Sequence, residues 1–201
     1  MPLILEPYLE QRARWPQSGR HILAQYSDDA VVVYQAYKPS IGRFAAEHGY
    51  FGGEWSESRM TWIKPNFLSM MFRSRWAQKE GQEVVLAIWL RREAFDEILR
   101  RAVVSTFDPS MYESREAWQT AVHGSSVRLQ WDPDHDPTGA KVERRAIQLG
   151  LRGDSARRFA REWVLGIEDV TELVAREREH ATPSRYAELV TPREDVYPAP
   201  A

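Results

Sequence analysis

The distribution of apolar positions along the chain predicts its strands. β-Branched and aromatic residues fill residues 21–26 and 30–37, and the polar residues 27–29 between them predict a hairpin turn. Val84–Leu90 is apolar at every position, so we expect a central strand buried on both faces. Residues 126–131 alternate, with Arg128 and Gln130 on the polar side, which predicts a half-buried strand. Two further strands are predicted over residues 145–151 and 164–170, the first in a hairpin with the alternating strand.

Apolar residues at helical spacing predict helices over residues 41–49, 66–77, 91–104, 114–122, 154–163 and 172–180. The helix over 66–77 follows Pro65, a residue that suits the first turn of a helix. Its predicted buried stripe consists of Leu68, Phe72 and Trp76.

These elements predict a single compact α+β domain with a mixed, largely antiparallel sheet and flanking helices. We expect this domain to span residues 21–180. Residues 1–20 are interrupted by three prolines and a glycine, so we expect them to be irregular. Residues 181–201 are expected to form a C-terminal extension with a mobile, proline-rich tail.

Composition narrows the class of protein. The chain has 201 residues, of which 43% are hydrophobic and 28% charged, with a formal net charge of −2. No apolar run approaches the roughly 20 residues of a membrane helix, and the opening residues lack the features of a secretory signal. The absence of cysteine excludes disulfides, thiolate metal sites and cysteine nucleophiles. We therefore expect a cytoplasmic protein with no membrane partner, and the net charge argues against a generally cationic nucleic-acid binder.

The segment Arg59–Trp76, called here the basic-aromatic segment, is the strongest candidate for a functional surface. It contains four basic residues, no acidic residue and four large aromatic rings. Cations beside flat rings suit an anionic ligand that itself carries a ring. The helix predicted to start near Asn66 would add a helix N-terminus, which is a natural anion site. The alternative interpretation is a core helix whose arginines pair with carboxylates elsewhere.

Acidic residues provide weaker candidates. Four of them share the ligand spacing of a calcium loop: Asp132, Asp134, Asp136 and Glu143. Pro137 stands where such a loop requires glycine, so we expect a solvated acidic turn and no metal site. Gln130 and Asp132 lie at a strand end and could form the polar rim of a pocket, with a plain hairpin terminus as the alternative.

Several segments occur in a distinctive order: ILAQYSDDAVVVYQAY, GRFAAEHGYFGG, RMTWIKPNFLSMMFRSRWA, GQEVVLAIWLRREAFDEIL, VRLQWDPDHD, AIQLGL and WVLGIEDVT. This set resembles the family called domain of unknown function 4291, from about residue 21 to residue 171. The resemblance is densest in RMTWIKP and the helix after it, followed by QWDP. It implies a kind of protein without implying an activity.

The strand that ends in VYQAY, with the short helix and GYF turn after it, is also similar to the opening of ADP-ribosyltransferase-type folds. In those folds a residue of the first strand helps to hold nicotinamide adenine dinucleotide (NAD), and a carboxylate orients the ribose under attack. The similarity implies NAD as a candidate cofactor. It implies Glu168 and Asp132 as candidates for the catalytic carboxylate, with Glu143 as a rival.

Two functions remain open at the level of the sequence. The first is an enzyme acting on a nucleotide or another phosphate-bearing ligand, as an ADP-ribosyl- or glycosyl-type transferase or hydrolase. Basic side chains would hold its phosphate and an aromatic ring would stack on its base. The candidate ligand-binding residues are Tyr34, Gln35, Arg59, Thr61, Trp62, Lys64, Arg73 and Gln130. The second is a non-catalytic module that binds RNA or another anionic partner through the same face.

Overall fold

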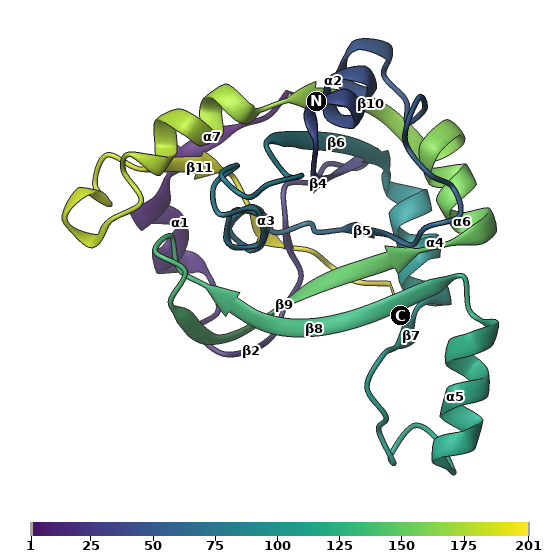
Figure 1. Ribbon diagram of the computed structural model, residues 1–201. Helices are drawn as coiled ribbons and strands as arrows, with labels where there is room; N and C mark the ends of the chain where they lie inside the picture. Colours follow the sequence, from purple (N-terminus) through teal and green to yellow (C-terminus); the bar gives the residue numbers. More distant parts are fainter. Residues whose placement is uncertain (1, 201) are drawn as a thin grey trace.

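Two large sheets, two small two-stranded sheets and the helices packed around them form the protein, as the computed structural model of residues 2–200 shows (Figure 1). The first sheet has the strand order β10-β6-β4 and is antiparallel throughout. Its strands are β4 (Ala30–Tyr37), β6 (Val84–Arg91) and β10 (Val164–Asp169). The central position of β6 confirms the prediction from its uninterrupted apolar sequence.

The second sheet has five strands in the order β2-β9-β8-β7, with β5 also paired to β9. Its strands are β2 (Gly19–Arg20), β5 (Thr61–Ile63), β7 (Val103–Val104), β8 (Val127–His135) and β9 (Lys141–Leu151). The long β8–β9 hairpin and the β5–β9 pair are antiparallel, whereas β2 and β7 add in parallel. The α+β class with mixed, largely antiparallel pairing is therefore confirmed.

The helices lie close to the predicted ranges. They are α2 (Pro39–His48), α3 (Phe67–Ser74), α4 (Arg92–Arg101), α5 (Arg115–Gly124), α6 (Gly153–Arg158) and α7 (Thr171–Arg178). A π-helical turn, η1 (Phe159–Trp163), continues α6. Gly49 ends α2 with a positive φ of 74°, which glycine adopts without the strain that a Cβ atom causes. Helix α5 contains no buried residue and projects from the body of the protein (Figure 1).

The first sheet is buried on both faces, which explains the apolar character of every position in β6. Along β4, Val31 and Val33 face one hydrophobic cluster, which lies against the second sheet, α4 and α6. Val32 and Tyr34 face a second cluster, formed with α3, α7 and segments near both ends of the chain. Successive side chains of a strand point to opposite faces, so one strand supplies both clusters.

The predicted buried stripe of α3 is correct for the burial of Leu68 and Trp76 and wrong at Phe72. Leu68 is buried, but Phe72 is 49% exposed. Trp76 is buried although it lies beyond the helix, which ends at Ser74. The backbone turns there through left-handed conformations, including Trp76 with φ of 54° and Ala77 with φ of 62°. The turn, rather than a further helical repeat, carries the Trp76 ring into the core.

The prediction that residues 1–20 are irregular is wrong for residues 2–20, the part of this segment that the structure describes. They contain β1 (Leu5–Pro7), α1 (Tyr8–Arg14) and β2. Pro7 lies at the start of α1 and Pro16 beyond its end, so the prolines flank the helix and do not interrupt it.

The C-terminal extension is packed onto the body, contrary to the expected mobile tail. Its elements are the 3₁₀-turn η2 (Pro183–Arg185), β11 (Val190–Pro192) and β12 (Asp195–Val196). Strand β11 pairs with β1, and β12 pairs with β3 (Leu23–Ala24). Tyr197 is buried, and its hydroxyl donates a hydrogen bond to Asp96 at 2.6 Å. The extension therefore belongs to the core.

A buried ion pair attaches the N-terminal segment to the second sheet. Arg144 of β9 contacts Asp134 of β8 at 2.6 Å, and both side chains are buried. Arg144 also donates a hydrogen bond to the carbonyl of Pro16 at 2.7 Å, and its guanidinium lies 5.3 Å from the centre of the Trp15 ring.

Within residues 2–200, none of the helices has the length and apolar sequence needed to cross a membrane.

Candidate functional site

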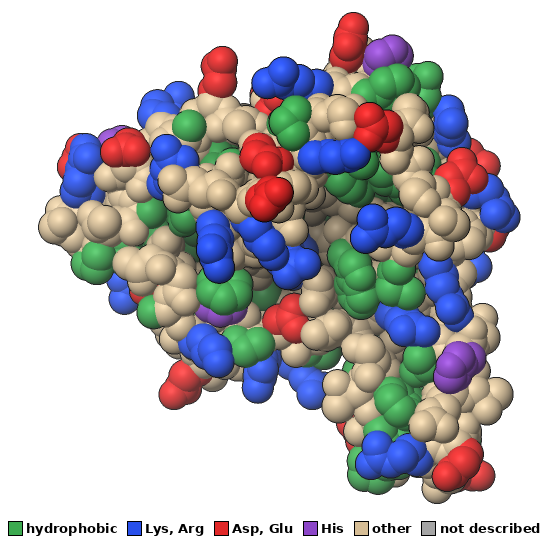
Figure 2. Space-filling model, viewed as in Figure 1, with side chains coloured by type: hydrophobic (Ala, Val, Ile, Leu, Met, Phe, Trp, Pro, Cys, Tyr) green, Lys and Arg blue, Asp and Glu red, His purple; other side chains and the backbone are tan. Residues whose placement is uncertain are grey.

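A cavity of about 810 Å³ opens between the end of β4 and the face of the second sheet. Residues from β4, β5, α3, β8, β9 and the loop before β5 line it. Figure 2 shows basic side chains gathered around a hollow near the centre of this face of the protein. The basic-aromatic segment supplies much of the lining, from Arg59 to Arg73.

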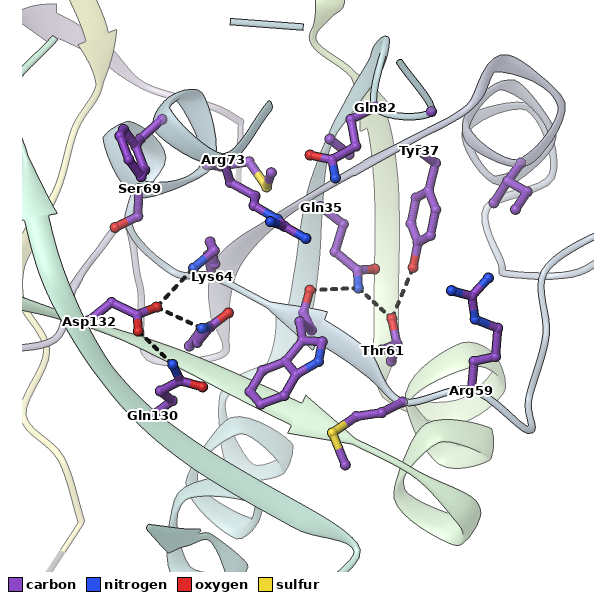
Figure 3. A pocket seen from close by; sticks show the side chains of 18 of the residues that line it. Gln35, Tyr37, Arg59, Thr61, Lys64, Ser69, Arg73, Gln82, Gln130 and Asp132 are labelled. Carbon is purple, nitrogen blue, oxygen red and sulfur yellow. Dashed lines mark hydrogen bonds and ion pairs between the residues drawn. The ribbon is translucent and has the colours of Figure 1, made fainter. Parts of the chain in front are cut away.

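Three cations of the basic-aromatic segment meet in this cavity. Arg59 comes from the loop before β5, Lys64 follows β5 and Arg73 lies on the exposed side of α3. In Figure 3, Arg59 and Arg73 extend toward the middle of the cavity from opposite sides. Within residues 2–200, neither arginine forms an ion pair with a carboxylate. Their charge is therefore available to a ligand.

Lys64 is held firmly and is only 8% exposed. Its backbone exchanges two hydrogen bonds with Tyr34 of β4, at 2.7 and 3.2 Å, which connects the two sheets at this point. Its ammonium lies 3.6 Å from a carboxylate oxygen of Asp132. Burial lowers the pKa of Lys64, and the nearby Arg73 charge lowers it further, while Asp132 acts in the opposite direction.

Asp132 organises the floor of the cavity. Gln130 donates a hydrogen bond to one oxygen of its carboxylate at 2.8 Å, and Gln148 donates to the other at 2.6 Å. Gln130 and Gln148 are directly paired across β8 and β9, so they lie on the same face of the sheet. The alternation predicted for β8 placed Gln130 and Asp132 on this face.

A second polar network lies at the end of β4. The Gln35 amide donates to the Thr61 hydroxyl at 2.6 Å and to the Trp62 carbonyl at 2.9 Å. The Thr61 and Tyr37 hydroxyls are 2.9 Å apart, and the Trp55 indole donates to Tyr37 at 3.1 Å. Burial raises the pKa of Tyr37, so its hydroxyl is neutral at physiological pH.

Two aromatic surfaces line the cavity. Trp62 of β5 pairs with Gly150 of β9 and packs over it. A Cβ atom at Gly150 would lie 3.0 Å from the Trp62 ring and 2.7 Å from the Met60 sulfur, so only glycine leaves this ring in place. Phe72 stacks on His135 with ring centres 3.5 Å apart, and burial lowers the pKa of His135.

Three predicted candidates lie outside the cavity. Tyr34 is completely buried and packs edge-on against Phe67, because it points to the α3 side of the first sheet. It cannot stack on a ligand in this cavity. Glu168 of β10 borders a separate shallow depression beside Trp89, and Glu143 lies exposed on β9. Asp132 is the candidate carboxylate that the structure brings to the cavity.

The N-terminus of α3 does not form the expected anion site for a ligand. Asn66 caps the helix by accepting a hydrogen bond from Ser69 at 2.8 Å. The carboxylate of Glu194, from the C-terminal extension, accepts hydrogen bonds from the Phe67 amide at 2.5 Å and from Asn66 at 2.7 Å. The Glu194 carboxyl group therefore fills the position that an anion would take at this helix end, and burial raises its pKa well above the ordinary value.

The aspartates with calcium-loop spacing each serve a different structural purpose. Asp132 binds the two glutamines, Asp134 pairs with Arg144, and Asp136 accepts hydrogen bonds from Thr138 in the β8–β9 turn. Their separate partners explain the acidic run without a shared ligand.

Sequence reasoning missed several lining residues, including Tyr37, Gln82 and Gln148. Gln148 could have been predicted from the sequence, because the position of the turn between β8 and β9 determines which residue of β9 lies opposite Gln130. Gln82 precedes β6 in a loop, where no periodicity indicates direction.

Comparison with known protein families yields one match. The family model described as Domain of unknown function (DUF4291) matches residues 21–197, which is most of the chain. The chain therefore belongs to this family, as its ordered segments predict. A search of curated proteins found no match. Neither finding supports the weaker similarity to ADP-ribosyltransferase-type folds.

Proposed function

We propose that this member of the DUF4291 family binds a nucleotide, or a similar phosphate-bearing ligand, in the cavity between its two sheets. The observation that carries the proposal is the convergence of Arg59, Lys64 and Arg73 on one cavity. The two arginines lack carboxylate partners within residues 2–200, and forked guanidinium groups match phosphate oxygens well.

The remaining lining suits the rest of such a ligand. Trp62 offers a ring for stacking on a base, and its position over Gly150 is fixed by close packing. Polar side chains on β8 and β9 offer hydrogen-bond partners beside that ring. The volume of about 810 Å³ lies within the usual range for small-molecule sites.

The proposal extends to catalysis of ADP-ribosyl or glycosyl transfer, or of the corresponding hydrolysis, with Asp132 as the carboxylate. A carboxylate in such a site stabilises the positive charge that develops on the sugar. Glu54, the other acidic residue of the lining, is largely exposed and paired with Lys38, whereas Asp132 lies more deeply in the floor of the cavity, which makes it the better placed group.

Calorimetric titration with nucleoside mono- and diphosphates, NAD and inorganic pyrophosphate tests the binding proposal. Arg73→Gln should weaken the affinity of the best ligand by about tenfold or more, because hydrogen bonds to charged groups contribute about 1.5–3 kcal/mol. Arg100→Gln is the matched control, since Arg100 is exposed on α4 outside the cavity. The absence of binding at millimolar concentrations of every compound would rule the proposal out.

A second assay separates this function from the RNA-binding alternative. Retention of single-stranded RNA on a filter should be weak here, because the cations gather in a cavity and the net charge is −2. Strong retention that falls steeply with salt, together with no nucleotide binding, would establish the RNA-binding module instead.

Chromatography tests the catalytic extension. NAD and the nucleotides that bind are incubated with the protein, and release of the free base is followed over time. Release that disappears in Asp132→Asn would support a glycosyl-type reaction. If the wild-type protein releases no base from any bound compound, the function is binding alone.

A further inference from the structure

Glutamine side chains give the cavity an excess of hydrogen-bond acceptors. Four of them line it: Gln35, Gln82, Gln130 and Gln148. Within residues 2–200, none of their carbonyl oxygens accepts a hydrogen bond. Those of Gln35 and Gln82 are inaccessible to solvent, whereas those of Gln130 and Gln148 are not, so this second pair offers acceptors to a ligand that carries donors.

Asp132 determines how two of these amides are turned. A carboxylate has only acceptor oxygens, so Gln130 and Gln148 must both direct their NH₂ groups toward it. Each amide then presents its carbonyl oxygen on the side away from Asp132. The orientation follows from the hydrogen bonding itself, because the reversed amide would place oxygen against oxygen.

The two carbonyls form a pair of fixed spacing. Gln130 and Gln148 are directly opposite each other on neighbouring strands, where Cβ atoms are about 5 Å apart. Gln148 is two residues from Gly150 on the same strand face, so the pair lies next to the Trp62 ring. Lys64 lies 3.6 Å from Asp132, and its positive charge beside this carboxylate disfavours a metal ion at this position.

We propose that Gln130 and Gln148 recognise the two adjacent hydroxyls of a ribose and thereby select ribonucleotides over deoxynucleotides. This inference rests on the proposed function and adds the class of sugar to it. The base of a nucleotide is bonded directly to its ribose. The Trp62 ring, which would stack on the base, likewise lies next to the carbonyl pair, which would bind the ribose. Two hydroxyl donors match two fixed acceptors, whereas a base amine offers a single nitrogen.

The experiment measures affinities for matched ribo-, 2′-deoxy- and 2′,3′-dideoxynucleoside diphosphates of adenine, guanine, cytosine and uracil. For the nucleotide that binds, the affinity of the ribo form should exceed that of the dideoxy form by about tenfold or more, because the dideoxy form lacks the two hydroxyls that donate hydrogen bonds to the site. In Gln148→Leu and in Gln130→Leu this ratio should fall to within about threefold, and Gln119→Leu on the exposed face of α5 should leave it unchanged.

Asp132→Asn provides a second variant that keeps the size of the side chain. Its amide presents one oxygen and one NH₂ group, so one of the two glutamines must turn its carbonyl inward. The preference for ribose should fall, and the thermal melting temperature should fall as well because Lys64 loses this carboxylate, so the ribose ratio is the deciding measurement. A purely structural role for Asp132 would alter the melting temperature and leave the ratio intact.

The outcomes are distinguishable. Equal affinity for ribo and dideoxy forms in the wild-type protein would overturn the ribose assignment and leave the proposed nucleotide site standing. A ribose preference that survives both glutamine variants would overturn the assignment to these residues. If no nucleotide of any series binds, both this inference and the proposed function fail.

Discussion

Lys64 carries a charge that the fold makes costly in the absence of a ligand. Its ammonium is buried, and the one carboxylate within 4 Å of it among residues 2–200 is that of Asp132, which is 3.6 Å away and already bound by two amides. Arg73 adds like charge nearby, and the pKa of Lys64 is accordingly lowered. A phosphate group in the cavity would supply negative charge beside Lys64, which would raise the pKa of Lys64 and make its charged form less costly.

Lys64→Met should therefore stabilise the ligand-free protein and weaken nucleotide binding. Replacement of this buried charge by an apolar side chain should raise the free energy of unfolding by about 1 kcal/mol at neutral pH, because the partly exposed Asp132 keeps its two amide donors when Lys64 is removed. Urea denaturation measures this difference, and Lys79→Met is the control because Lys79 lies outside the lining of the cavity. A variant that is less stable yet binds nucleotide normally would contradict this account.

The stability of the wild-type protein should also depend on pH through Lys64. Between its lowered pKa in the folded protein and the ordinary value of 10.5, the unfolded chain binds more protons than the folded one. Lys64 therefore causes the free energy of unfolding to increase as the pH rises through this range. The advantage of Lys64→Met should shrink as the pH approaches 10.5, which urea denaturation at several pH values would show.

At the scale of elements, the strands of the second sheet were easier to predict than α3. The alternation in β8 assigned Gln130 and Asp132 to one face correctly, since a period of two leaves no freedom once a strand is recognised. The predicted stripe of α3 failed at Phe72 because the helix is short and most of its positions are buried, so its apolar spacing does not single out one face. Phe72, exposed on its outer side, instead stacks on His135, a contact that depends on tertiary structure.

Strand β9 should control the position of the stacking ring. Gly150→Ala places a methyl group against the Trp62 ring and the Met60 sulfur, so Trp62 must shift. We expect nucleotide affinity to fall several-fold and the free energy of unfolding to fall by about 1–3 kcal/mol, the usual cost of overpacking. Gly166→Ala on β10 is the matched control, since nothing lies within 4 Å of its Cβ position. Nucleotide titration and thermal denaturation compare the two variants. Equal losses of affinity and of stability in Gly150→Ala and Gly166→Ala would refute the prediction.

At the scale of the whole molecule, the C-terminal extension holds distant parts of the chain together. Its strands pair with β1 and β3. The Trp15 indole donates to the carbonyl of Glu194 at 2.7 Å, and Gln11 accepts a hydrogen bond from the Glu194 amide at 2.8 Å. No local pattern indicates such contacts, because they join residues more than 170 positions apart, and prolines at both ends suggested irregular segments instead.

A chain shortened to end at Pro192 should lose more than about 4 kcal/mol of unfolding free energy, since it lacks the buried Tyr197 ring and the Glu194 contacts. Nucleotide binding should weaken with it, because α3 carries Arg73. A chain that ends at Tyr197 should behave like the 201-residue chain. Thermal denaturation followed by circular dichroism compares the three chains, and equal melting temperatures would show the extension to be dispensable.

The Glu194 contact also constrains when the protein matures during synthesis. The first amide of α3 is made early, as part of residue 67, whereas its carboxylate partner belongs to residue 194. A nascent chain on the ribosome therefore contains the whole cavity lining, from Gln35 to Gln148, before the helix that carries Arg73 can be secured. Ligand capture by the growing chain should be poor until translation has passed Glu194, so the acquisition of binding waits for a residue made long after the cavity lining.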